Sequence, residues 1–154
     1  MNQPLMHPES LRKAIIRCDR GEVLQPVAGK VIPLSQIPDN LFSAGLLGPG
    51  VGIKPDGDII YSPISGTVSA IIAGNYAIGL SGSGMEVLIH IGIDTVRMKN
   101  AGFEALVAEG EAISIGQPLL RFDRTRIAAE GLSDIVAVVL TNAAALGHVE
   151  CIVE

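Results

Sequence analysis

Short runs of Val and Ile, interrupted at brief intervals by Gly or Pro, are the feature that most restricts how this chain folds. The sequence contains 18 glycines and 9 prolines, which fall between apolar runs such as VGIKP, GTVSAII and MEVLIHI. β-Branched residues favour strands, while Gly and Pro favour the turns between them. Within residues 23–154, only Arg124 to Glu130 has a helical pattern. We therefore predict an all-β fold, a mostly antiparallel β-sandwich or flattened barrel with short helical turns.

The composition excludes several classes of function. A chain of 154 residues with 48% hydrophobic content is large and apolar enough for one globular core. A net charge of −5 and an aromatic content of 3% provide little basic or stacking surface for nucleic acid. No stretch approaches the ~20 apolar residues of a membrane span, and the N-terminus lacks a secretory pattern. We expect a cytoplasmic protein in which Cys18 and Cys151, which form no CxxC pair, stay reduced.

The first residues differ in character from the rest. We predict an N-terminal arm over residues 1–22 and a β domain over residues 23–154. In the arm, Ser10 is a candidate helix cap, and an amphipathic helix would place four apolar residues on one stripe: Leu11, Ala14, Ile15 and Cys18. Two interpretations of this short helix remain open. It docks on its own domain, or it is a basic arm that touches an acidic membrane surface.

One ionisable side chain, His90, stands in the middle of the apolar run MEVLIHIGIDTVRM. This run predicts a largely buried strand, in which alternation puts Leu88, His90 and Gly92 on one face and Val87, Ile89, Ile91 and Ile93 on the other. A lone histidine in such a strand is often a core residue whose ring nitrogens have backbone partners. The alternative is a nucleophile, base or metal ligand in an apolar depression.

Other chemistries lack their sequence patterns. The GPGVG and SGSG segments run into strands, whereas a phosphate-binding loop leads into a helix. Serine hydrolysis would need a GxSxG elbow, which is missing. A catalytic zinc usually takes three protein ligands, but His7, His90 and His148 form no HxH or HExxH pair. What remains is His90 acting as a nucleophile without a metal or cofactor.

Three segments carry a specific pattern: GVGIKPDGDIIYSPISGTVSAI, SGMEVLIHIGIDTV and KNAGFEALVAEGEAISIGQPLLRFD. In this order and spacing, from about Val23 to Asn142, the chain resembles the glucose-type enzyme IIA of the bacterial phosphoenolpyruvate-dependent sugar phosphotransferase system. The resemblance implies a phosphocarrier whose His90 accepts a phosphoryl group from phospho-HPr and passes it to a cysteine of a IIB domain. It implies no metal and no cofactor.

The resemblance also implies a docking surface around His90. Its expected apolar rim consists of Leu41, Phe42, Leu46, Leu47, Ile72, Ile78, Leu88 and Val96. Such a rim binds a partner and excludes water that would hydrolyse a phosphohistidine. Asp39 and Asp94 match acidic positions that border the family's site, where they would meet the basic surface of HPr. The alternative for both carboxylates is a role as turn caps.

One position departs from the family. Where the family has a second, helper histidine in a TNHAF-like segment, this chain reads GNYAI, with Tyr76 in place of the histidine. Tyrosine donates one hydrogen bond to a phosphoryl oxygen but stays neutral near pH 7, so it cannot replace a cationic donor. We therefore expect weakened onward transfer, unless Tyr76 is a packing substitution in a scaffold that transfers without the helper. The rival function is a regulatory module that binds partner proteins.

The C-terminus is a second departure. After Asn142 the chain ends with AAALGHVECIVE, which is shorter than the family's usual closing strands. We expect His148 in this segment to be exposed and not to replace the helper histidine.

Overall fold

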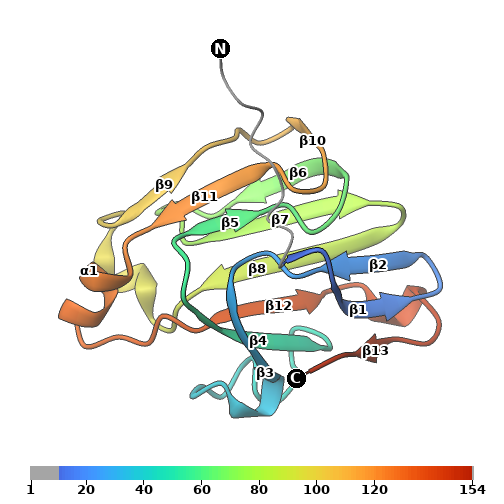
Figure 1. Ribbon diagram of the computed structural model, residues 1–154, viewed down its shortest axis with the longest axis horizontal. Helices are drawn as coiled ribbons and strands as arrows, with labels where there is room; N and C mark the ends of the chain where they lie inside the picture. Colours follow the sequence, from blue (N-terminus) through green and yellow to red (C-terminus); the bar gives the residue numbers. More distant parts are fainter. Residues whose placement is uncertain (1–10, 154) are drawn as a thin grey trace.

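The computed structural model describes residues 11–153, which form three antiparallel β-sheets and one short α-helix, α1 (Arg124–Ala129) (Figure 1). Helix α1 confirms the helical pattern seen from Arg124 to Glu130. The Asp123 carboxylate caps it by accepting a hydrogen bond of 3.1 Å from the backbone N–H of Arg126. Every strand pair is antiparallel, so the predicted mostly antiparallel all-β fold is confirmed.

A seven-stranded sheet forms the centre of the molecule. Its strands follow the order β10 (Ala112–Ile113), β6 (Gly66–Ile71), β7 (Ala77–Gly82), β8 (Met85–Ile91), β12 (Val136–Leu140), β4 (Gly50–Pro55) and β3 (Gly29–Pro33). Strand β8 is the middle strand, with β7 on one side and β12 on the other. Ser83 and Gly84, the second half of the SGSG segment, form the turn between β7 and β8.

Two three-stranded sheets lie against the central sheet (Figure 1). One has the order β13 (Glu150–Cys151), β1 (Ala14–Cys18) and β2 (Gly21–Leu24); the other has the order β5 (Ile59–Tyr61), β11 (Pro118–Phe122) and β9 (Phe103–Ala105). The main core contains residues of all three sheets, including Ile16, Ile89 and Leu120, each fully buried. Burial of this apolar face holds the layers together.

The opposite face of the central sheet carries a second, smaller apolar cluster. Strand β12 contributes to both, because Val136, Val138 and Leu140 point into the main core while Ala137 and Val139 point into the small cluster. Phe42, from the segment between β3 and β4, is buried in the small cluster. This segment therefore covers part of the face on which His90 stands.

The helix predicted for the N-terminal arm is wrong over the residues that the structure describes. Ala14–Cys18 is the strand β1, and the predicted boundary at residue 22 falls inside β2. Ile15 and Ile16 are both buried in the main core, because a register shift between Ala14 and Ile16 turns two consecutive side chains inward. The candidate cap Ser10 lies outside the described residues.

The reason for this error is a long-range pairing. Strand β1 bonds to β2 on one side and to β13, at the C-terminal end of the chain, on the other. Backbone groups paired on both sides favour a strand over the marginal helix that the local pattern indicated. In the described range no helix is long and apolar enough to cross a membrane.

Candidate functional site

His90 stands on the central strand β8, one residue before its end. Burial alternates along this strand, with Met85, Val87, Ile89 and Ile91 buried and the residues between them partly exposed. The alternation confirms the predicted face of His90. Its cross-strand neighbours are Ala77 on β7 and Ala137 on β12. Because directly opposite residues share a face, these small side chains leave room around the imidazole ring.

Two aromatic rings pack against the imidazole. The Phe42 ring lies with its centroid 5.2 Å from that of His90 at an interplanar angle of 57°. The Tyr76 ring also lies 5.2 Å away, in an edge-on arrangement of 72°. Tyr76 in turn contacts Phe103, at 6.3 Å between centroids, and packs against the main core. The imidazole therefore contacts two aromatic rings, one from the segment between β3 and β4 and one from the residue before β7.

A hydrogen bond determines which nitrogen of His90 is free. Nδ1 lies 2.8 Å from the carbonyl oxygen of Gly92, which can only accept, so Nδ1 carries the proton in the neutral ring. Burial lowers the pKa of His90 below its ordinary value of 6.5, although the bond to Gly92 and the charge of Asp39 act in the opposite direction. Near pH 7 the ring is thus neutral, with a lone pair on Nε2.

A small pocket of about 290 Å³ opens beside His90. Its other lining residues are Asp39, Asn40, Leu41, Phe42, Ile93 and Asp94. The pocket is mainly apolar, and Asp39 and Asp94 contribute its carboxylates. This arrangement differs from that of a sealed core histidine, because one ring nitrogen has a backbone partner while the ring borders an opening.

The structure brings together only part of the predicted rim. Asp39, Leu41, Phe42 and Asp94 line the pocket with His90. Leu46, Ile72 and Val96 do not line it, but they are exposed, with exposed fractions of 70%, 40% and 58%. Leu47 and Leu88 are partly buried and pack against the small apolar cluster.

The predicted docking role of Ile78 is wrong. Ile78 is fully buried and belongs to the main core. It lies opposite Ile89 on β8, and both residues point away from the face that carries His90. The error comes from register, because one residue along a strand reverses the face of the side chain. Ala77, one position earlier, is the β7 residue beside His90.

Asp39 acts as a cap inside its own loop. Its Oδ2 accepts a hydrogen bond of 2.9 Å from the N–H of Phe42, and its Oδ1 accepts one of 3.0 Å from the N–H of Ser43. The Ser43 hydroxyl donates back to the Asp39 carbonyl oxygen. Asp94 differs, since it is exposed and its side chain caps nothing in the turn that follows it. The cap alternative therefore describes Asp39 but not Asp94.

We expect Asp39→Asn and Asp94→Asn to differ in stability although each removes one charge. In Asp39→Asn, the amide NH₂ would face a backbone N–H, so the free energy of unfolding should fall by about 1 kcal/mol. Asp94→Asn should change it by less than about 0.5 kcal/mol, because Asn tolerates the left-handed backbone at that position. Urea unfolding of both variants measures the difference. Equal losses would show that the Asp39 cap contributes nothing.

The lowered pKa of His90 makes stability depend on pH in a defined direction. Between the folded pKa and 6.5, the unfolded chain binds more protons than the folded chain. The free energy of unfolding therefore rises with pH across this window and falls as the solution is acidified through it. We expect Tm, followed by circular dichroism, to fall less on acidification in His90→Gln than in wild type. Identical pH profiles would contradict a depressed pKa.

Several residues that shape the site carry no signal of this role in the sequence. Asn40 and Ile93 line the pocket, and Ala77 and Ala137 flank the imidazole on the neighbouring strands. Ile93 follows His90 closely in sequence, so strand alternation alone assigned it to the far face. The turn after β8 changes that direction, because Gly92 has a φ of +77°. The alanines carried no chemical signal.

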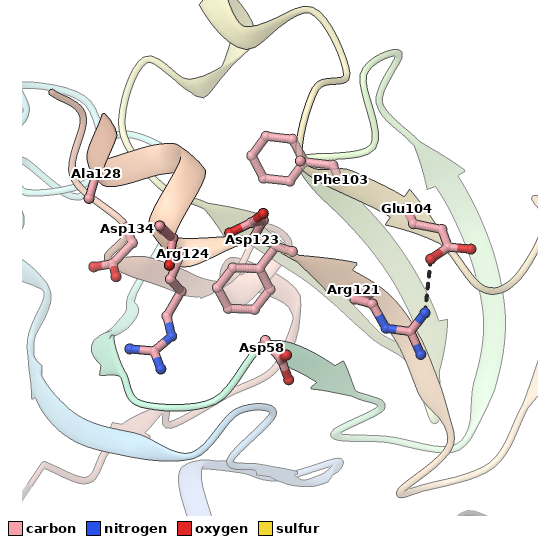
Figure 2. Close-up of a pocket in the computed structure, with 11 residues that line it drawn as sticks. Asp58, Phe103, Glu104, Arg121, Asp123, Arg124, Ala128 and Asp134 are labelled. Atoms are coloured by element: carbon pink, nitrogen blue, oxygen red, sulfur yellow. Dashed lines mark hydrogen bonds and ion pairs between the residues drawn. The ribbon is translucent and has the colours of Figure 1, made fainter. Parts of the chain in front are cut away.

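A larger groove of about 850 Å³ lies between β9, β11 and α1 (Figure 2). Its charged groups mostly bond within the protein: Arg121 Nη1 to Glu104 Oε1 at 3.0 Å, and Arg124 Nη1 to the Pro55 carbonyl oxygen at 3.1 Å. It contains no histidine or cysteine, and its lining residue Phe103 contacts Tyr76, which packs against His90. The smaller pocket is therefore the better candidate for chemistry.

Metal-binding side chains do not gather in the described part of the chain. Among residues 11–153, no three His, Cys, Asp or Glu side chains form a group that could hold a metal ion. His148 is exposed, as expected, and His7 lies outside the described residues.

Comparisons with known proteins agree with this fold. Residues 21–146 match the family of the phosphoenolpyruvate-dependent sugar phosphotransferase system, EIIA 1. The mannose-specific EIIBCA component of Corynebacterium glutamicum is 39% identical over 130 residues, which are 84% of this chain and 19% of that protein. The solved glucose permease IIA from Mycoplasma capricolum is 32% identical, with a TM-score of 0.74, over 78% of this chain and 79% of its own.

The fold and the pocket define a β-sandwich protein with one half-buried, neutral histidine on its central strand. The chain belongs to the EIIA 1 family of the phosphoenolpyruvate-dependent sugar phosphotransferase system, as its match over residues 21–146 shows. It is a IIA domain of a sugar-transport system, and it spans 19% of the length of the EIIBCA relative.

Proposed function

We propose that this IIA domain is a cytoplasmic phosphocarrier that accepts a phosphoryl group from phospho-HPr on Nε2 of His90. It then passes the group to a cysteine of a IIB domain. The observation that supports this most is the 2.8 Å contact between His90 Nδ1 and the Gly92 carbonyl oxygen, at the edge of an open pocket. This contact leaves Nε2 as the nucleophile.

The phosphoryl transfer needs no metal or cofactor to account for its bonds and electrons. The Nε2 lone pair forms a bond to phosphorus while the bond between phosphorus and the donor breaks, and the bonding electrons leave with the donor. The imidazole gains positive charge as it reacts, and the Gly92 carbonyl oxygen stabilises this charge through Nδ1–H. Onward transfer to a cysteine thiolate reverses these events and restores the neutral ring.

Exposed apolar residues near the site support docking of a partner. Leu41 is 44% exposed at the pocket, and the predicted rim residues Leu46, Ile72 and Val96 are also exposed. Asp94 adds an exposed carboxylate that suits the basic surface of HPr. The EIIBCA name of the C. glutamicum relative supports a IIB domain as the acceptor.

Incubation with phosphoenolpyruvate, enzyme I and HPr tests the first half of the proposal. Mass spectrometry should find one added phosphoryl group, labile to acid, in wild type and none in His90→Ala. His148→Ala is the matched control, because it removes an exposed histidine outside the pocket and should label like wild type. An unlabelled wild type would refute phosphoryl acceptance.

The second candidate is a regulatory IIA-like module, favoured by Tyr76 at the helper position. Its ring packs between His90 and Phe103, where it provides contact but no positive charge. In this case the phosphorylated protein persists and binds regulatory protein targets. Adding a cognate IIB domain separates the two functions: rapid loss of the label supports the carrier, and a persistent label supports the regulatory module.

A further inference from the structure

The turn that follows β8 directs a carbonyl group back at His90. Gly92, with φ of +77°, and Asp94, with φ of +61°, reverse the chain before the 3₁₀ turn Thr95–Met98. Gly92 N–H donates to the Ile135 carbonyl oxygen at 2.8 Å, and Ile93 N–H donates to that of Ser133 at 3.1 Å. These bonds tie one side of the turn to the segment that leads into β12.

Thr95 holds the other side of this turn through a side-chain hydrogen bond. Its side chain is 1% exposed, and its hydroxyl donates a hydrogen bond of 2.6 Å to the carbonyl oxygen of Ile91. Its methyl group occupies the space beside Gly92, where an added Cβ would lie only 2.4 Å from Thr95 Cγ2. Thr95 therefore links the residue before Gly92 to the 3₁₀ turn that follows it, while lying outside the lining of the His90 pocket.

We propose that Thr95 is a positioning residue, whose hydroxyl fixes this turn so that the Gly92 carbonyl selects the Nδ1–H tautomer of His90. The effect of Thr95 on phosphoryl transfer rests on the proposed phosphocarrier function, whereas its effect on the His90 tautomer does not. A neutral imidazole with the proton on Nε2 has no lone pair at the open pocket and cannot attack phosphorus. Because Thr95 is buried, its effect is independent of any contact with HPr or IIB.

The test compares Thr95→Val with Thr95→Ser. Val keeps the buried shape and loses the hydroxyl, whereas Ser keeps the hydroxyl and loses the methyl group. Nitrogen-15 NMR of the histidine ring, at a pH above the His90 pKa, reports the tautomer in the free protein. We expect Nδ1–H alone in wild type and Thr95→Ser, and a mixture with Nε2–H in Thr95→Val. Phosphoryl acceptance should fall roughly tenfold in Thr95→Val and recover in Thr95→Ser.

A folded Thr95→Val with the wild-type tautomer and rate would overturn the inference. If Thr95→Val fails to fold, Thr95→Ser still tests the inference. A shift of the His90 ring to the Nε2–H tautomer in Thr95→Ser would show that the hydroxyl does not set the tautomer. Failure of the phosphocarrier function looks different. The wild type would then take no label from phospho-HPr, while the tautomers of the three proteins would still follow the predicted order.

Discussion

Replacing Tyr76 with histidine should increase onward phosphoryl transfer to a IIB domain by about a hundredfold. A protonated histidine there could donate a charge-assisted hydrogen bond to the phosphoryl group as it leaves His90, which a neutral tyrosine cannot do. The ring at this position already lies 5.2 Å from the imidazole, so a histidine would lie at the reacting group. Quenched-flow measurement of label transfer from the purified phosphoprotein to IIB gives the rate.

Tyr76→Phe is the matched control for this prediction. The Tyr76 hydroxyl makes no hydrogen bond to any residue within 11–153, so Phe should keep the contacts with His90 and Phe103. We expect the Tyr76→Phe variant to transfer the phosphoryl group at a rate within about threefold of the wild-type rate, since only one neutral donor is lost. If Tyr76→His transfers no faster than wild type, the missing helper histidine is irrelevant and Tyr76 is a packing substitution.

Gly92→Ala should lower the free energy of unfolding by about 3 kcal/mol and abolish most phosphoryl acceptance. The new Cβ would lie 2.4 Å from Thr95 Cγ2 and 2.8 Å from the Ser133 carbonyl oxygen, so the turn must move. Such a movement withdraws the carbonyl group that accepts the Nδ1 proton of His90. Urea unfolding gives the loss of stability, and labelling by phospho-HPr gives the loss of acceptance.

Gly131→Ala separates backbone strain from the clash. Gly131 has a φ of +73°, close to that of Gly92, but an added Cβ would meet nothing within 4 Å. Its substitution should cost about 1 to 2 kcal/mol and leave acceptance unchanged. If Gly92→Ala is no worse than Gly131→Ala, the space beside Thr95 is not tight, and the account of the turn is incorrect.

The sequence predicted the central strand and the face of His90 because both depend on short-range alternation. Every second side chain along β8 is apolar and points inward, so His90, which lies between two of them, points to the other face. The same argument could not predict Ile93 at the pocket, since the turn at Gly92 changes the direction of the chain. The resemblance, which assigned the rim without the register between β7 and β8, misplaced Ile78.

Two other features depend on contacts that are distant in sequence. The N-terminal pattern fits a helical stripe, but β1 pairs with β13 more than a hundred residues away, and this pairing determines its structure. Likewise, acidic character alone does not distinguish Asp39 from Asp94. Only the structure shows that the Asp39 carboxylate accepts two backbone hydrogen bonds, while Asp94 remains exposed. The cap holds Phe42 against the imidazole.

The most direct measurement is NMR of the phosphorylated protein labelled with nitrogen-15 at histidine. Coupling between phosphorus and a ring nitrogen identifies the atom that carries the phosphoryl group. The account predicts coupling to Nε2 of His90, with Nδ1 still protonated and bonded to Gly92. A phosphoryl group on Nδ1, or on any other side chain, would contradict the claim that the structure presents a neutral Nε2 for attack.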